Sequence, residues 1–256
     1  GSLPPRENKL LAVVGSRKMT AYGKQVCEKL VGDLAMSGVT IVSGLALGVD
    51  AVAHKTAIEV DGRTIAVVGG GLDKIYPPGN TALAREITRH GAIISEYPLD
   101  YPALPLNFPA RNRIVSGMAL GVLVIEGAEK SGTLLTASHA ASQGREVFAV
   151  PGQITSFSSA APHFLLKNGA KLVERADDIL EDLDIKTKVK TTQAKSVLPE
   201  AKEEQKILEI LENEELDIDT IVRISGMETS TALATLTGME LKGMVKNIGG
   251  KYARTS

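Results

Sequence analysis

The feature that most constrains this chain is a series of short apolar runs that alternate with amphipathic stretches. The runs are at 10–14, 40–43, 64–68, 92–95, 120–125, 146–150 and 170–173. Stretches with helical spacing lie between them, at 20–37, 49–60, 79–90, 133–144 and 162–168. Strands that are apolar at every position are covered on both faces, and their alternation with helices predicts a mostly parallel sheet. We therefore expect residues 1–183 to form a doubly wound α/β domain.

The remaining residues predict a linker and a second, smaller domain. Residues 184–202 are rich in Lys, Thr, Gln and Ser, which is typical of a flexible linker. Residues 203–256 predict three short helices and then a hairpin. The helices are expected at 203–213, 217–224 and 229–241, and the hairpin at 243–254 with a Gly249-Gly250 turn. Three helices followed by a hairpin is the order of a winged helix.

Composition limits the classes of protein to which the chain can belong. The 29 Lys and Arg against 30 Asp and Glu give a net charge of −1, so a nucleic-acid surface must be a local patch. The single cysteine, Cys27, is expected to be a buried small hydrophobe, and its lack of a disulfide partner fits a reducing cytosol. No apolar run approaches the ~20 residues of a membrane span, and no leader is visible. We expect a cytoplasmic protein without a membrane segment, metal or cofactor.

Two glycine-containing turns resemble phosphate cradles. Gly15-Ser16-Arg17 follows the first strand and opens a helix, where free N–H groups and the Arg17 charge would attract an anion. The alternative is an ordinary turn with an exposed arginine, and this segment alone does not decide. Lys130-Ser131-Gly132-Thr133 repeats the arrangement after the fifth strand. Glu126 and Glu129 lie close by and would repel a phosphate unless they are paired, for example with an arginine.

The segment 108–113 carries an aromatic ring and two arginines. Phe108 either stacks on a base or fills the core. On a helix, Arg111 and Arg113 would point about 200° apart, so they cannot share one target. We expect one of them to grip a phosphate and the other to anchor the loop. Glycine-containing turns at 44–48 and 69–71, at neighbouring strand ends, are expected to add a smooth groove lined by backbone.

Evidence for catalysis is weak in this sequence. Asp50 and His54 are four residues apart on one helix face, which would suit proton transfer. A helix N-cap aspartate with a structural histidine explains them more simply, because no nucleophile is near in the sequence. Neither the nucleotide-hydrolysing G-x-x-x-x-G-K-[ST] pattern nor the G-x-S-x-G elbow occurs. We expect a binding protein and not an enzyme.

Taken together, these motifs resemble the DNA-processing protein A family, also called DprA or Smf. The matching elements occur in order over about residues 11–183. They are Gly15 to Arg17 with Tyr22-Gly23, Ser43 to His54, Thr64 to Pro77, Ser95 to Pro98, Phe108 to Ile114, Ser131 to Ala137 and Gly144 to Gly152. Each is modest alone, but seven in order are specific.

The resemblance implies an extended Rossmann fold that binds single-stranded DNA in a basic pocket. It also implies a homodimer that loads the RecA recombinase onto that DNA during natural transformation. Matched by position, the DNA-binding residues would be Ser16, Arg17, Lys74, Phe108, Arg111, Arg113, Lys130, Ser131, Gly132 and Thr133. The family's dimer surface lies near 158–166, where this sequence departs from the usual pattern. Phe164, Leu165 and Leu166 would supply an apolar patch there.

Two other functions remain open at this point. The first is a nucleotide phosphoribohydrolase of the lysine-decarboxylase-like group, which has a related sheet. That group places a glutamate shortly after P-G-G-x-G-T, whereas Leu134, Leu135 and Thr136 follow Thr133 here. The second is a duplex-DNA regulator that acts through the winged helix. Residues 201–256 hold 7 basic and 10 acidic residues, which is unfavourable for a polyanion, although 220–256 holds 5 basic and 2 acidic residues.

Overall fold

The chain divides into two compact units, Gly1–Val189 and Lys190–Ser256. The computed structural model describes all residues except 6–7, 186–200, 212–214, 242–243, 249 and 255–256. The predicted bounds 1–183, 184–202 and 203–256 stay predictions, because most of the expected linker lies outside the described residues.

A seven-stranded parallel sheet forms the centre of the first unit. Its strands are β1 (Leu10–Val14), β2 (Thr40–Ser43), β3 (Thr64–Val68), β4 (Gly91–Ser95), β5 (Gly121–Val124), β6 (Glu146–Ala149) and β7 (Lys171–Leu172). The spatial order is β4-β3-β2-β1-β5-β6-β7, and every neighbouring pair is parallel. The predicted doubly wound α/β fold is therefore confirmed.

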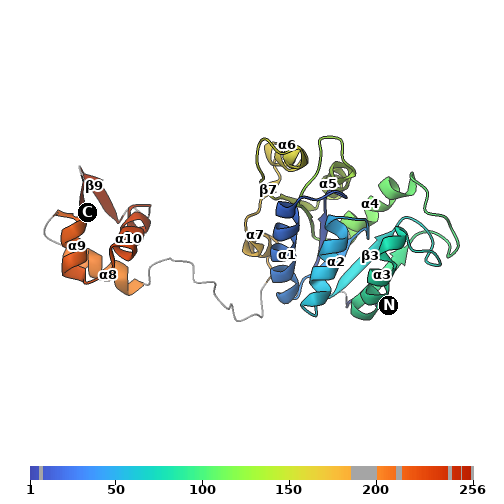
Figure 1. Cartoon of the computed structure of the whole chain (residues 1–256), viewed down its shortest axis with the longest axis horizontal. Helices are drawn as coiled ribbons and strands as arrows, with labels where there is room; N and C mark the ends of the chain where they lie inside the picture. Colours follow the sequence, from blue (N-terminus) through green and yellow to red (C-terminus); the bar gives the residue numbers. More distant parts are fainter. Residues whose placement is uncertain (6–7, 186–200, 212–214, 242–243, 249, 255–256) are drawn as a thin grey trace. The chain divides into compact units, whose positions relative to one another are not determined.

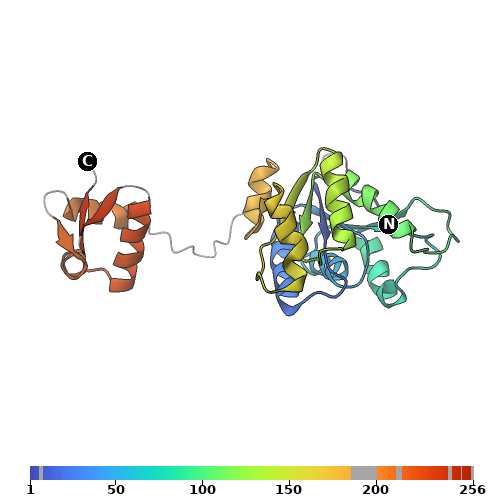
Figure 2. The same cartoon turned by 90° about the horizontal axis from the view of Figure 1, so that it is seen from above.

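Helices cover both faces of this sheet (Figures 1 and 2). On one face α1 (Ala21–Met36) contacts α2 (Val49–Glu59) and α7 (Ala176–Asp182), and α2 contacts α3 (Thr81–His90). On the other face α4 (Asn107–Met118) contacts α5 (Gly132–Ser142), which contacts α6 (Ala160–Lys167). Short 3₁₀ turns, η1 (Pro78–Asn80) and η2 (Phe157–Ser159), precede α3 and α6.

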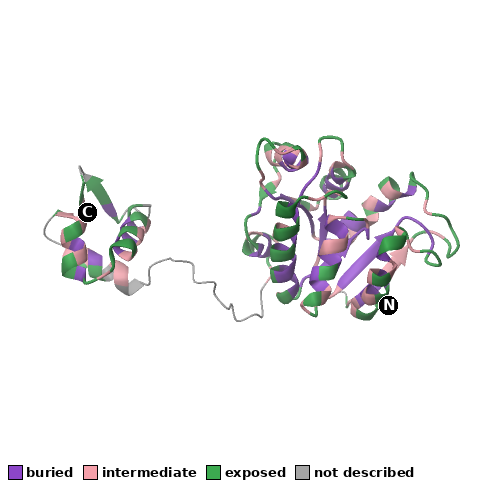
Figure 3. Cartoon of the chain, viewed as in Figure 1, coloured by how far each residue is buried: buried purple, intermediate pink, exposed green. Residues whose placement is uncertain are grey.

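Alternate residues of the strands supply two apolar cores. Leu11 and Val13 of β1 pack with α1, α2 and α7, whereas Ala12 and Val14 pack with α4 and α5. All five residues of β3 are buried, as Figure 3 shows for the strand in purple. Cys27 lies fully buried in the α1 core, as expected. Helices α4 and α7 were not predicted.

The second unit is a small helical domain with an antiparallel sheet. Its elements are α8 (Ala201–Ile210), β8 (Leu216–Asp217), α9 (Ile218–Ser225), α10 (Thr229–Leu241), β9 (Val245–Ile248) and β10 (Lys251–Arg254). The sheet order is β8-β10-β9. The core includes Ile207, Ile221, Leu236 and Met239. The three predicted helices and the two strands of the predicted hairpin are present, whereas Gly249 of its predicted turn lies outside the described residues. Strand β8 is a third strand that the sequence pattern did not reveal.

Candidate functional site

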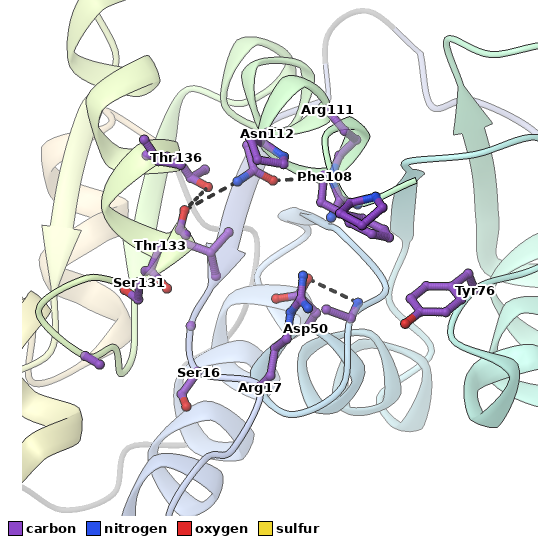
Figure 4. A pocket seen from close by; sticks show the side chains of 18 residues that line it. Ser16, Arg17, Asp50, Tyr76, Phe108, Arg111, Asn112, Ser131, Thr133 and Thr136 are labelled. Atoms are coloured by element: carbon purple, nitrogen blue, oxygen red, sulfur yellow. Dashed lines mark hydrogen bonds between the residues drawn. The ribbon is translucent and has the colours of Figure 1, made fainter. Parts of the chain in front are cut away.

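The order of the sheet reverses between β1 and β5, and a cavity opens where these strands end. In doubly wound folds such a reversal leaves a crevice at the carboxyl edge. The cavity measures about 510 Å³. Its polar lining residues are Ser16, Arg17, Asp50, Tyr76, Arg111, Asn112, Ser131, Thr133 and Thr136, and Phe108 supplies an aromatic wall (Figure 4). We call this the basic cavity, because Arg17 and Arg111 outnumber its single carboxylate.

The β1–α1 loop forms one wall, and a glycine on the neighbouring loop holds it in place. Gly48 has φ = +79°, a conformation that favours glycine. A Cβ on Gly48 would collide with the backbone oxygen of Ser16. Because that space is free, the Val49 amide donates to the Ser16 carbonyl at 3.1 Å. The close contact fixes the backbone from which Arg17 projects.

Arg17 is the exposed cation of the cavity. Its guanidinium carbon lies 5.5 Å from the centroid of the Phe108 ring, which is within the range of a cation–π contact. The centroid of the Tyr76 ring lies 5.6 Å from that of the Phe108 ring, and both residues line the cavity. Within the described part of the chain, Arg17 makes no ion pair. The Arg17 charge is therefore available to a ligand, beside two aromatic rings.

Arg111 has a different role, because only 5% of its surface is exposed. Its Nη1 donates to the carbonyl of Gly44 at 2.6 Å and to the carbonyl of Val67. Its Nε donates to the Oδ1 of Asn112 at 3.3 Å. These bonds tie α4 to the ends of β2 and β3. Arg111 thus forms the floor of the cavity. The sequence had left open which of the two arginines would anchor the loop, and the structure shows that Arg111 does.

Asp50 lies close enough to Arg111 for the two charges to influence each other. Its Oδ2 accepts from the amides of Gly44 and Ala46 at 3.1 and 3.3 Å. Burial raises the pKa of the Asp50 carboxyl, and the Arg111 charge opposes that rise. Burial likewise lowers the pKa of Arg111, and Asp50 opposes that shift. Gly48, not Asp50, occupies the N-cap of α2, so the expected capping role is corrected.

His54, one turn along α2, is a structural residue. Its Nδ1 lies 2.6 Å from the hydroxyl of Thr64, which itself donates to the Ile41 carbonyl. Because that hydroxyl proton is already used, the His54 ring must donate through Nδ1. Burial lowers the pKa of His54 to about 3. The ring is thus neutral and bonded to Thr64, so it does not form a proton-transfer pair with Asp50.

The opposite wall of the cavity is the beginning of α5. Ser131 is the N-cap residue, but its side chain makes no cap bond, and the first turn contains no acidic residue. The Nδ2 of Asn112 donates to the Gly132 carbonyl at 3.4 Å, which links α4 to this turn. A helix amino terminus without a side-chain cap favours an anion. The wall across from Arg17 therefore suits a phosphate.

Family models match both units of the chain. Residues 1–184 match the model described as DNA recombination-mediator protein A, and residues 191–251 match the DprA winged helix domain. The chain belongs to this family. The resemblance found in the motifs is thereby confirmed, and so is the winged helix.

Individual DprA and Smf proteins agree with this assignment. The Smf protein of Escherichia coli K12 is 41% identical over 95% of this chain and 67% of its own length. The Bacillus subtilis DprA is 46% identical over 68% of this chain and 58% of its own length. The chain thus spans roughly two thirds of the curated relatives that it matches.

Two solved DprA structures share the fold. That of Streptococcus pneumoniae has a TM-score of 0.65 and 41% identity, and the match covers 69% of this chain and 62% of the other. That of Helicobacter pylori has a TM-score of 0.63 and 32% identity over 68% of this chain and 80% of the other. The Helicobacter pylori protein is described for its single-stranded DNA binding mode.

Six of the DNA-binding residues suggested by the DprA resemblance line the basic cavity together with Arg111. They are Ser16, Arg17, Phe108, Ser131, Gly132 and Thr133. Lys74, Arg113 and Lys130 are exposed and do not line it. Arg113 instead pairs with Glu96. Tyr76 and Asn112 also line the cavity but were not among the predicted DNA-binding residues, although both lie within the matched motifs at 64–77 and 108–114.

Two further expectations are corrected by the structure. The glycine turn at 69–71 does not open into a groove, because the β4–α4 segment covers it. The Gly71 amide donates to the Tyr101 carbonyl at 2.7 Å, and a Cβ on Gly70 would touch Ala103. Among the described residues, no arginine forms an ion pair with Glu126, and its carboxylate instead accepts hydrogen bonds from Thr20 and Ser158.

The three apolar residues expected at a dimer surface lie on α6 and differ in exposure. Phe164 is 54% exposed, whereas Leu165 and Leu166 are half-buried. Leu165 also packs against the α4–α5 core. Phe164 is therefore the side chain of the three that presents the most apolar surface to a partner.

Neither a metal-binding cluster nor a membrane-spanning helix occurs among the described residues. No three His, Cys, Asp or Glu side chains among them gather closely enough to hold a metal ion. None of the helices in that part of the chain combines the length and apolar character of a membrane span.

Proposed function

We propose that this chain binds single-stranded DNA in the basic cavity. The observation that carries the proposal is the free Arg17 guanidinium beside Phe108, opposite the amino terminus of α5. A cation and helix amides suit the phosphates, and an aromatic ring suits a base without reading its identity. The same function in the Helicobacter pylori relative supports it.

Titration of a fluorescently labelled oligo-dT by anisotropy tests this proposal. Arg17→Ala should weaken binding about tenfold or more, because it removes a charged hydrogen-bond donor. Lys18→Ala is the matched control, because Lys18 is the next residue, is also exposed and does not line the cavity. Equal affinities of the Arg17 variant and the wild type would refute the site.

We propose further that the bound strand is passed to the RecA recombinase. The matching family is one of recombination mediators, which supports this step. The test measures RecA ATPase activity on DNA coated with single-strand-binding protein. The wild-type chain should shorten the lag before RecA assembles, and Arg17→Ala should not.

A homodimer through α6 is also part of the proposal. The exposed Phe164 and the exposed Leu172 on the edge strand β7 support it. Sedimentation velocity of Phe164→Asp should show a monomer where the wild type is a dimer. A monomeric wild type would contradict this interface.

The action that we propose is binding without catalysis. Asp50 is the single carboxylate among the residues that line the basic cavity, and two backbone amides hold it. Leu135 and Thr136 of α5 line the cavity where a phosphoribohydrolase would need an acid. Release of a free base from a nucleoside monophosphate would contradict this proposal and favour the enzyme.

For the winged helix we propose an auxiliary or protein-contact role and not duplex reading. Its 7 basic and 10 acidic residues over 201–256 support this view. Deleting 203–256 should leave the affinity for a single strand nearly unchanged. A large loss of affinity would assign DNA binding to this unit.

A further inference from the structure

A second cavity lies at the same edge of the sheet, beside the basic cavity. It measures about 540 Å³. The β1–α1 segment separates the two, because residues 15–17 line the basic cavity and residues 20–22 line the second. The end of β5 and the segment after β6 complete its wall, through Glu126, Gln153, Ser156 and Ser159. We call it the acidic cavity.

Glu126 is the charged group of this cavity and is 3% exposed. Its Oε1 accepts from the hydroxyls of Thr20 and Ser158 at 2.5 and 3.2 Å, and its Oε2 accepts from the Thr20 amide at 2.9 Å. Since a carboxylate offers about four acceptor positions, these three bonds leave one unused, and Glu126 is among the residues that line the cavity. The amino terminus of α1 also offsets the negative charge. The Glu126 carboxylate can therefore accept a hydrogen bond from a neutral donor and does not require a positively charged partner.

Tyr22 provides a rigid aromatic plate in the same cavity. Its backbone lies in the first turn of α1, and its hydroxyl donates to the Pro151 carbonyl at 2.6 Å. The ring is thus held at both ends, yet the residue is 47% exposed. A fixed, exposed ring loses little freedom when a flat ligand stacks on it.

The residues that line the acidic cavity limit the kind of ligand that it can bind. No Lys, Arg or His lines the acidic cavity, and its carboxylate would repel a phosphate. Serine hydroxyls, an amide and an aromatic plate around an acceptor suit a flat heterocycle with N–H donors. A cavity of this volume lies in the usual range for small organic ligands.

We propose that the acidic cavity receives a base of the same DNA strand whose phosphates lie in the basic cavity. The inference rests on the proposed function and deepens it. Bases with an exocyclic amino group are favoured, because that group donates to Glu126. Thymine is disfavoured, because its single N–H is flanked by two carbonyl oxygens that would face the carboxylate.

Photo-cross-linking of the wild-type chain tests the placement directly. A short oligonucleotide of 5-iododeoxycytidine is bound, irradiated and mapped by mass spectrometry. Cross-links to both Phe108 and Tyr22 are expected. Cross-links to Phe108 alone overturn this inference and leave the proposed function intact, whereas an absence of binding overturns both.

Two variants give an independent measure. Tyr22→Leu should weaken oligo-dC binding by about fivefold to tenfold through lost stacking. Tyr101→Leu is the control, since Tyr101 is an exposed aromatic residue that lines neither cavity. Glu126→Gln should reduce the preference for oligo-dC over oligo-dT. Unchanged oligo-dC binding by Tyr22→Leu would exclude a base and point to a basic side chain of a protein partner.

Discussion

The two cavities at the carboxyl edge are similar in volume but differ in chemistry. The basic cavity, about 510 Å³, holds Arg17 and a floor built by Arg111. The acidic cavity, about 540 Å³, holds Glu126 and the Tyr22 ring. Arg17 and Tyr22 are only five positions apart, on either side of one turn. One segment at the sheet reversal therefore borders both cavities, with a cation facing one of them and an aromatic ring facing the other.

The comparison also shows how differently a charge can be used. Arg17 is exposed and unpaired in the described structure, so a ligand can reach its charge. The Arg111 and Glu126 groups are nearly buried, and their hydrogen bonds go mainly to the protein itself. A charge within a cavity is thus available to a ligand only to the extent that the fold leaves it unsatisfied.

The largest effect is expected when the floor of the basic cavity is removed. Arg111→Met should destabilise the first unit by about 3–5 kcal/mol, because it leaves two buried carbonyls without a donor and removes the positive charge that opposes the effect of burial on Asp50. Arg113→Met is the matched control; its exposed pair with Glu96 should contribute less than about 1 kcal/mol. Urea unfolding compares them. Equal losses of stability would mean that Arg111 is not structural.

A second prediction concerns pH and the residues next to this floor. The pKa of His54 is about 3 when folded, below its ordinary 6.5, so the unfolded chain binds a proton first as pH falls. Stability should therefore drop by about 2 kcal/mol between pH 7 and pH 5 through this residue. The free energy of unfolding of the wild type and of His54→Gln is measured at both pH values. The difference between the two proteins separates the contribution of His54 from that of Asp50. The same pH dependence in both proteins would contradict it.

The salt dependence of binding should separate the two cavities. Arg17→Ala is expected to lower the slope of log affinity against log salt by about 0.7, the value for one phosphate of a single strand. Tyr22→Leu should weaken binding without changing that slope, because the proposed arrangement places a base and no phosphate in its cavity. A reduced slope in the Tyr22 variant would show that phosphates contact both cavities, which would contradict the proposed difference between them.

The smallest effects are expected at the cations outside both cavities. Lys74 and Lys130 are exposed and line neither cavity, so each can attract the strand only from a distance. Lys130→Ala and Lys74→Ala should each weaken oligo-dT binding by about twofold to threefold. A loss in Lys130→Ala as large as that in Arg17→Ala would show that the strand passes over the β5–α5 turn itself.

Much of the first unit was predictable because its signals are local. Continuous apolar runs identified the strands, and glycine after β1 marked the turn that carries Arg17. Helix α4 was missed, although Pro109 lies in its first turn, where a missing N–H costs little. The site residues Tyr76 and Asn112 were missed because their importance depends on what packs opposite them.

The sequence by itself determined the seven strands of the first unit, the edge of the sheet at which the basic cavity opens and the position of Arg17 after β1. These follow from apolar periodicity and backbone geometry, which act over a few residues. Only the tertiary structure decided that Arg111 bonds to Gly44 and Val67, that residues 98–103 cover the glycines at 69–71, and that Glu126 and Tyr22 share a cavity. Those outcomes depend on which groups become desolvated together, and burial of that kind is a property of packed elements far apart in the chain.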